Sequence, residues 1–263
     1  MYLGFNLTSN MDFSPWYTEG KRSYDEKAKE IKKDLQHYLY EGTKTLNGNL
    51  IEDDWFPKFN ADVFLSHSHA DEKKVIGFSG WLKDNFGLTV FIDSCVWGYT
   101  NDLLKIIDDK YCQNSEETMY DYNKRNYSTS HVHMMLSMAL TKMMDKTELV
   151  IFMETLNSIQ PVSQTITETT KSPWIYSELV MTNLIRKKVP NRKIEKSFEK
   201  RAFNEAEKLD VAYDVNIYLN KLITLKDANL NIWRQEFNQD YLKAHPLDYL
   251  YSQFKRSEEM MSK

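Results

Sequence analysis

The chain has few cysteines, no long apolar run and no excess of basic residues. Only two of its 263 residues are cysteine, Cys95 and Cys112. This number is too small for a disulfide framework and is typical of a reducing compartment. No apolar run approaches the roughly 20 residues needed to cross a bilayer. The net charge is -4 and the pI is near 5.9, whereas a general nucleic-acid-binding protein usually carries a basic excess.

The N-terminal segment MYLGFNLTSNMDF has neither the basic region nor the continuous apolar region of a secretory signal. We therefore expect a cytoplasmic protein with no membrane partner and no nucleic-acid partner. The remaining composition, with 41% hydrophobic and 27% charged residues, is that of an ordinary globular protein. Its length is sufficient for one large domain with a sizeable core.

The first part of the chain has a helical pattern. Apolar side chains recur at the spacing of one helical face at Tyr24, Ala28, Ile31, Leu35 and Leu39. This spacing predicts an amphipathic helix that packs on another part of the protein. We expect residues 1–60 to form a helical extension packed on the core, and residues 61–263 to form the main domain.

The main domain alternates predicted strands and helices. Short apolar runs predict buried strands at 63–65, 88–93 and 148–154, and alternating apolar residues predict another at 211–219. Helices are predicted between these strands. Their predicted end signals are Ser68 and Asp71 as a capping box, Gly87 as a C-cap, Ser130 as an N-cap after an irregular stretch at 111–130, and Pro173 in a first turn. The alternation predicts a three-layer α/β fold with a mainly parallel central sheet.

In such a sheet, ligands bind beyond the carboxyl ends of the strands. Three loops fall at that edge. Ser66–His69 follows the first predicted strand, Asp93–Tyr99 follows the second, and 158–172 follows the third. The last loop leads to Trp174 and Glu178, which are one helical turn apart. The topology therefore predicts one site built from these three loops.

A metal site is an alternative interpretation of the first loop. His67, His69 and Asp71 resemble the beginning of the H-x-H-x-D-H motif of the metallo-β-lactamase superfamily, but Glu72 replaces the final histidine. A second H-x-H pair lies in a predicted helix, where positions i and i+2 do not face each other. The segment before the motif is also predicted to be helical, whereas that superfamily has β-rich sequence there. We therefore expect no metal at this loop.

A different resemblance accounts for more of the chain. The string DVFLSHSHADE, then VFIDSCVWG, then the helix beginning SPWIYSE is similar to a bacterial TIR (Toll/interleukin-1 receptor) domain over about 62–225. Trp174 to Glu178 matches the WxxxE motif of that family. The resemblance implies a flavodoxin-like TIR fold with an NAD-binding cleft. In place of the arginine-rich first loop of some relatives, this chain has His67, Ser68 and His69, and it carries a long insertion before the third strand.

The resemblance also implies an activity. TIR enzymes cleave the bond between nicotinamide and ribose in NAD, so NAD is the substrate and no cofactor or metal is required. Glu178 is then the catalytic carboxylate. The implied NAD-binding residues are Ser66, His67, Ser68, His69, Asp93, Trp97 and Trp174. The product would be ADP-ribose or a cyclic or modified ADP-ribose that activates a separate effector, as in antiphage systems similar to Thoeris, and the family implies self-association through TIR surfaces.

Each candidate residue also has a structural interpretation. Glu178 can be an ordinary carboxylate of a first helical turn, and Asp93 can cap a turn. Trp174 can anchor its helix to the sheet, Trp97 can be a core aromatic, and Ser66 can bond loop backbone. The functional alternative is correspondingly a non-catalytic TIR module that assembles with other TIR domains.

Overall fold

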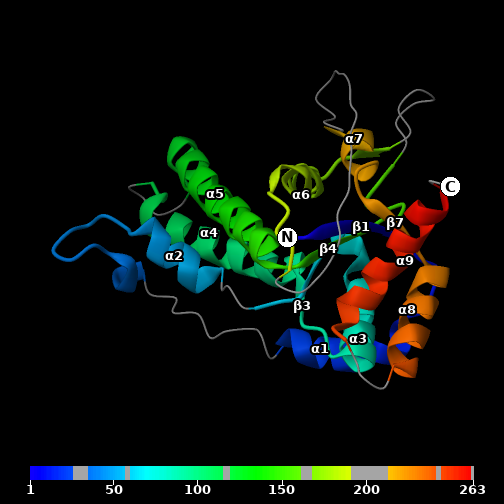
Figure 1. The fold of residues 1–263 in the computed structure, drawn as a ribbon. Helices are drawn as coiled ribbons and strands as arrows, with labels where there is room; N and C mark the ends of the chain where they lie inside the picture. The colour runs from blue at the N-terminus through cyan, green and yellow to red at the C-terminus, as the bar shows by residue number, and fades with distance from the viewer. Residues whose placement is uncertain are drawn as a thin grey trace.

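The computed structural model describes residues 1–25, 35–56, 60–114, 119–160, 168–190, 213–240 and 244–261. Its centre is a five-stranded sheet with helices on both faces (Figure 1). The strands of this sheet are β1 (Leu3–Thr8), β2 (Val63–Ser66), β3 (Val90–Ile92), β4 (Leu149–Met153) and β7 (Ile223–Lys226). Their order is β3-β2-β4-β1-β7, and every neighbouring pair is parallel. A separate antiparallel pair joins β5 (Thr169–Thr170) and β6 (Tyr213–Asp214).

The described helices surround the sheet. They are η1 (Ser14–Trp16), α1 (Tyr17–Asp25), η2 (Leu35–Tyr38), α2 (Gly48–Trp55), η3 (His69–Asp71), α3 (Glu72–Phe86), η4 (Asp93–Val96), α4 (Trp97–Tyr111), α5 (Tyr122–Lys146), α6 (Pro173–Leu184), α7 (Asn216–Leu219), α8 (Asp227–Gln239) and α9 (Pro246–Met261). None of those described combines the length and the apolar character of a membrane-crossing helix.

Successive side chains along each strand point to opposite faces of the sheet, so the apolar core has a part on each face. On one face, side chains such as Phe5, Leu65 and Ile151 pack against α3, α8 and α9. On the other face, Phe64 and its neighbours pack against α2, α4 and α5, and Phe152 packs against α6 and α7. The sheet is therefore the middle layer of three, as the alternation of strands and helices predicts.

β1 lies in the interior of the sheet, between β4 and β7. Leu3 pairs with Leu149, and Phe5 pairs with Ile223. The expectation that residues 1–60 form a helical extension misses this strand, because Leu3–Thr8 is part of the sheet. The predicted helix over residues 24–39 falls largely on residues outside the described ones, and η2 occupies its described C-terminal part.

The strand order relates to a flavodoxin-like order in a specific way. The flavodoxin order is 2-1-3-4-5. Here β3, β2, β4 and β7 take the positions of strands 2, 1, 3 and 5, while β1, the first strand of the chain, takes the fourth position. The five-stranded parallel sheet with helices is thus compatible with a flavodoxin-like fold. From β2 the chain passes to β3, which lies on one side of β2, and then to β4, which lies on the other side of β2. The strand order therefore reverses there, and the switch point lies between β2 and β4.

Several predicted end signals are confirmed and others are wrong. Gly87 ends α3 in the left-handed region with φ 68°, and Pro173 begins α6. However, α5 begins at Tyr122, capped by the side chain of Asp121. The hydroxyl of Ser130 lies within α5 and donates to the carbonyl of Asn126.

The capping box and the last predicted strand are also wrong. The side chain of Ser68 makes no cap hydrogen bond. Residues 211–219 were expected to form a strand, but in their described part only Tyr213–Asp214 is extended, and Asn216–Leu219 is helical. The carboxylate of Asp214 accepts the backbone amide of Asn216 where the short strand passes into the helix.

Candidate functional site

Four of the predicted site residues meet at the carboxyl edge of the sheet. Ser66 ends β2, His67 follows it, Asp93 follows β3, and Glu178 comes from α6. All four are buried, with exposed fractions between 2% and 4%. They belong to three segments of the chain that are far apart in the sequence. Their position beside β2 and β4 is the switch point, where open α/β sheets bind ligands.

The start of α6 determines where Glu178 lies. Ser172 is the N-cap, and its hydroxyl accepts a hydrogen bond from the amide of Ile175 at 3.3 Å. Pro173 occupies the first turn, where its missing N–H costs nothing. Glu178 then lies in the second turn and reaches β2, where the hydroxyl of Ser66 donates to its Oε2 atom at 2.5 Å.

His67 forms an ion pair with Asp93. Its Nδ1 atom lies 2.5 Å from Asp93 Oδ1, although the geometry is not that of an aligned hydrogen bond. The carboxylate of Asp93 also accepts the backbone amide of Ser94 at 2.8 Å. Asp93 is thereby held at the end of β3, next to both His67 and Glu178.

Burial and the neighbouring charges shift the proton affinities in this cluster. Burial and the negative charge of Asp93 raise the pKa of Glu178 well above its ordinary value, against the opposing effect of the Ser66 hydrogen bond. Burial lowers the pKa of His67, but the charge and close polar contact of Asp93, together with the charges of Glu72 and Asp71, raise it by more, so the pKa is raised overall. The surroundings therefore favour the neutral form of Glu178 and the charged form of His67.

Three buried polar atoms of the cluster have no hydrogen-bond partner among the described residues. They are Nδ1 and Nε2 of His67 and Oε1 of Glu178. Native proteins rarely leave such atoms unpaired, because each costs about 1–3 kcal/mol of stability. Unpaired donors and acceptors in one buried cluster are suited to a ligand or to water.

The other predicted site residues lie outside the cluster. His69 is exposed on η3, and Ser68 is half-buried. Trp174 is half-buried, and its ring contacts that of His133 edge-on, with 5.5 Å between the ring centroids. The backbone of Trp97 begins α4, but its side chain lies outside the described ones. The structure thus brings together Ser66, His67, Asp93 and Glu178, and leaves Ser68, His69 and Trp174 at or beyond the margin.

The cluster is closed in this structure. Among the described residues, side chains of α5 and α6 beside Glu178 enclose a space too small for a ligand, and they include Leu140, Met144, Trp174 and Met181. The carboxyl of Glu178 is 3% exposed. A substrate could reach it only after α6 or its neighbours move apart.

A second polar pair at the same edge was not predicted. Asn6 on β1 donates from Nδ2 to Glu154 Oε2, next to the end of β4. Asn6 and Ser66 both pair with Phe152, from opposite sides of β4, so they point to the same face of the sheet about 10 Å apart. The signal that could have found β1 is the alternation of Leu3, Phe5 and Leu7 with smaller or polar residues.

The histidines do not form a metal centre in the described part of the chain. His67 contacts Asp93, whereas His69 is exposed. Asp71, the third member of the sequence motif, accepts hydrogen bonds from the side chains of Thr155 and Asn157. Among the described residues, no three histidine, cysteine or acidic side chains are arranged to hold a metal ion.

Comparisons with known proteins add no relative. No protein-family model matches the chain, and neither the curated proteins nor the solved structures contain a match. The site and the fold therefore carry the functional argument.

Proposed function

We propose that this chain is an NAD-consuming enzyme of the TIR type, which cleaves the bond between nicotinamide and ribose. The observation that carries the proposal is the convergence of Ser66, His67, Asp93 and Glu178 at the switch point of a parallel sheet. The sequence resemblance assigns the same residues to an NAD cleft. The unpaired atoms of His67 and Glu178 support a site that is completed by a ligand.

Cleavage of the bond between nicotinamide and ribose requires mainly a negatively charged group close to the ribose. When neutral nicotinamide leaves NAD, positive charge spreads over the ribose ring, as in the transition state of glycoside hydrolysis. A carboxylate beside the ribose stabilises that charge and orients the hydroxyl groups. Glu178 has this role, and the hydroxyl of Ser66 holds its second oxygen in place. Water as the acceptor gives ADP-ribose, and an acceptor within the same molecule gives a cyclic product.

The closed cluster describes a resting state. Burial and Asp93 hold the proton on Glu178, and a neutral carboxyl stabilises a cation poorly. Separation of α6 from α5 admits water and substrate, which removes the cause of the raised pKa and releases the carboxylate. Assembly with other copies through TIR surfaces would stabilise the open form, and the nucleotide product would then reach a separate effector.

One observation favours a non-catalytic TIR interaction module as the second candidate. Glu178 is almost fully buried, and the space that the described residues leave beside it is too small for a ligand. A buried polar cluster of this kind can simply fix the position of α6 on the sheet. The two candidates differ in whether the carboxylate is ever exposed to NAD.

The test is the release of nicotinamide from NAD by the purified full chain, followed by chromatography across a range of protein concentrations. We expect release that rises more steeply than the protein concentration. Glu178→Gln should abolish it, with a loss of at least about a hundredfold, the usual scale for removing one stabilising group. Glu41→Gln, at an exposed glutamate, is the matched control and should keep full activity. Absence of nicotinamide release at every concentration, with or without a phage-derived trigger, would favour the interaction module.

A further inference from the structure

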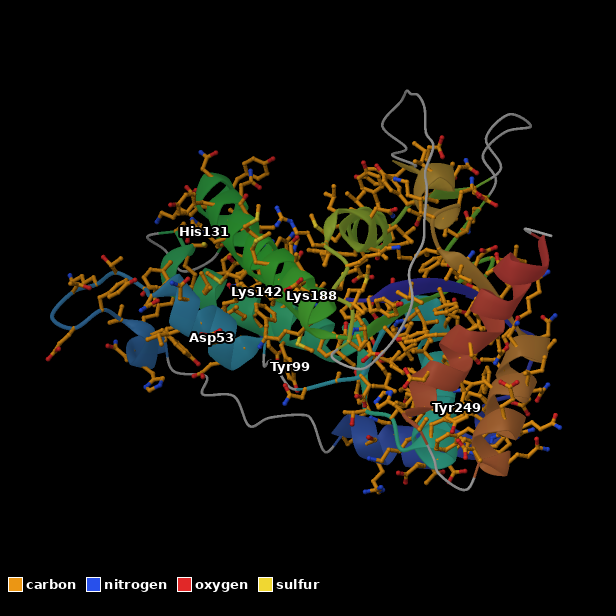
Figure 2. The ribbon with its side chains drawn as sticks, viewed as in Figure 1. Asp53, Tyr99, His131, Lys142, Lys188 and Tyr249 are labelled. Atoms are coloured by element: carbon orange, nitrogen blue, oxygen red, sulfur yellow. The ribbon has the colours of Figure 1, made fainter. Side chains whose placement is uncertain are left out.

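A large cavity lies away from the cluster, between α2, α4, α5 and the segment at 44–46. Its volume is about 790 Å³, which is within the range of about 300–1,000 Å³ found for small-molecule sites. Its lining shares no residue with the cluster around Glu178. Helix α5 extends past both regions, and its outer half carries His131 while its inner half, nearer the sheet, carries Lys142 (Figure 2).

The wall of the cavity is mainly apolar. Leu46, Ile51, Ile107 and Met135 contribute aliphatic side chains, and two tyrosines contribute rings. The thiol of Cys112 also faces this space and is 1% exposed. Burial raises its pKa, so the thiol is neutral and adds to the apolar wall. These side chains are suited to contact the aliphatic or aromatic part of a ligand.

The charged lining has one sign. Lys44 and Lys124 line the cavity beside the ring of His131, and no aspartate or glutamate does so among the described residues.

The nearest buried carboxylate is already occupied by other partners. Asp108 accepts hydrogen bonds from Ser128 Oγ at 2.5 Å and from Arg125 Nε at 3.0 Å. Asp108 thus adjoins the lining residues Ser128 and Cys112, and its negative charge is paired with Arg125. Within the described residues Lys44 and Lys124 form no ion pair, and an anionic group entering the cavity would supply one.

We propose that this cavity binds a small amphipathic anion, with an apolar body against Ile51, Ile107 and Met135 and a single anionic group near Lys44 and Lys124. The volume of the cavity limits the ligand to a small molecule, the apolar lining favours an apolar body, and the two lysines favour an anionic group. A cationic amphiphile of equal length would place its charge beside the lysines and is excluded. The proposal does not depend on the NAD reaction, because binding is measured without turnover.

The experiment is a fluorescence titration of the full chain with 1-anilinonaphthalene-8-sulfonate, which combines apolar rings with one sulfonate. Dodecanoate and dodecyltrimethylammonium then compete with it below their micelle concentrations. We expect saturable binding of one dye per chain and displacement by dodecanoate at a concentration at least about tenfold lower than by the cation. A tenfold ratio corresponds to about 1.4 kcal/mol. Equal displacement by both amphiphiles would overturn the charge assignment.

Two pairs of variants locate the site. Met135→Trp fills the cavity, whereas Met134→Trp adds the same side chain at the adjacent position of α5, which is 60% exposed. The first should weaken dye binding at least about tenfold, and the second should leave it unchanged. Lys124→Glu reverses a charge of the lining at an exposed position, and Lys105→Glu is its control on the exposed side of α4.

The charge pair keeps the proposal falsifiable if Met135→Trp does not fold, because both lysines are exposed and their replacement leaves the core intact. Weakened dodecanoate binding in Lys124→Glu alone supports the proposal. Unchanged binding in Lys124→Glu, or equal loss in Lys105→Glu, overturns it.

Discussion

Replacement of Glu178 by glutamine should change how the stability of the protein depends on pH. The carboxyl is 3% exposed, and its pKa is raised by burial and by Asp93. Above about pH 4.5 the unfolded chain has lost this proton while the folded protein still binds it. The folded state therefore binds more protons, and its free energy of unfolding falls as the pH rises, until the pH passes the folded-state pKa.

The expected change in the free energy of unfolding with pH comes from the titration of a single proton. A single group held protonated in the folded state lowers the free energy of unfolding by about 1.4 kcal/mol for each pH unit in that window. Glutamine resembles the neutral carboxyl in size and does not titrate, so the variant lacks this slope. Relative to the wild type, Glu178→Gln should gain stability at this rate from about pH 5 upward, until the pH reaches the folded-state pKa of Glu178. His67 titrates in both the wild type and the variant, so its contribution to the free energy of unfolding largely cancels when the two proteins are compared.

The assay is urea denaturation followed by tryptophan fluorescence at several values from about pH 5 to about pH 7.5. Glu41→Gln, at an exposed position, is the control and should keep the pH dependence of the wild type. A difference between Glu178→Gln and the wild type that stays constant across this range would refute the reasoning, since it would mean that Glu178 is ionised in the folded protein.

Two further predictions concern packing. Ser66→Ala removes the hydroxyl that donates to Glu178, so a buried carboxyl oxygen loses its partner. The free energy of unfolding measured by urea denaturation should fall by about 1–3 kcal/mol. An equal fall in Ser130→Ala, at an exposed position of α5, would contradict this prediction. Gly80→Ala should cost at least about 1–3 kcal/mol, because a Cβ there would lie 2.2 Å from a backbone oxygen of the packed η1 segment. At Gly48 the nearest atom is the end of a methionine side chain at 3.2 Å, so a thermal melt of Gly48→Ala should show a much smaller loss.

The strands with continuous apolar runs were predictable from the sequence, as were α3 and α6. VFL and VFI are short apolar runs bounded by polar residues, and Gly87 and Pro173 mark helix ends whose backbone geometry few other residues fit. β1 is hard to predict because it is short and alternates apolar residues with Gly4, Asn6 and Thr8, whereas the helical spacing that follows it is longer. β7 was missed because only Leu225 of its four residues is buried, so its pattern is weak.

The residues of the site were predictable for a topological reason. Side chains directly after parallel strands must lie at one edge of the sheet, so Ser66, His67 and Asp93 converge. His69 does not, because the chain turns into η3 immediately after Ser68. The burial of Glu178 depends on how α5 packs against α6, which is a long-range property that no local spacing encodes.

The position of β1 has a consequence for the order of folding during synthesis. This strand leaves the ribosome well before both of its neighbours in the sheet, since Leu3 pairs with Leu149 and Phe5 with Ile223. Until then its apolar side chains and both of its edges are unpaired, and such strands recruit chaperones or aggregate. A strand of the sheet that is translated early is therefore among the last to be fixed, and the nascent chain must protect it until residue 226 has emerged.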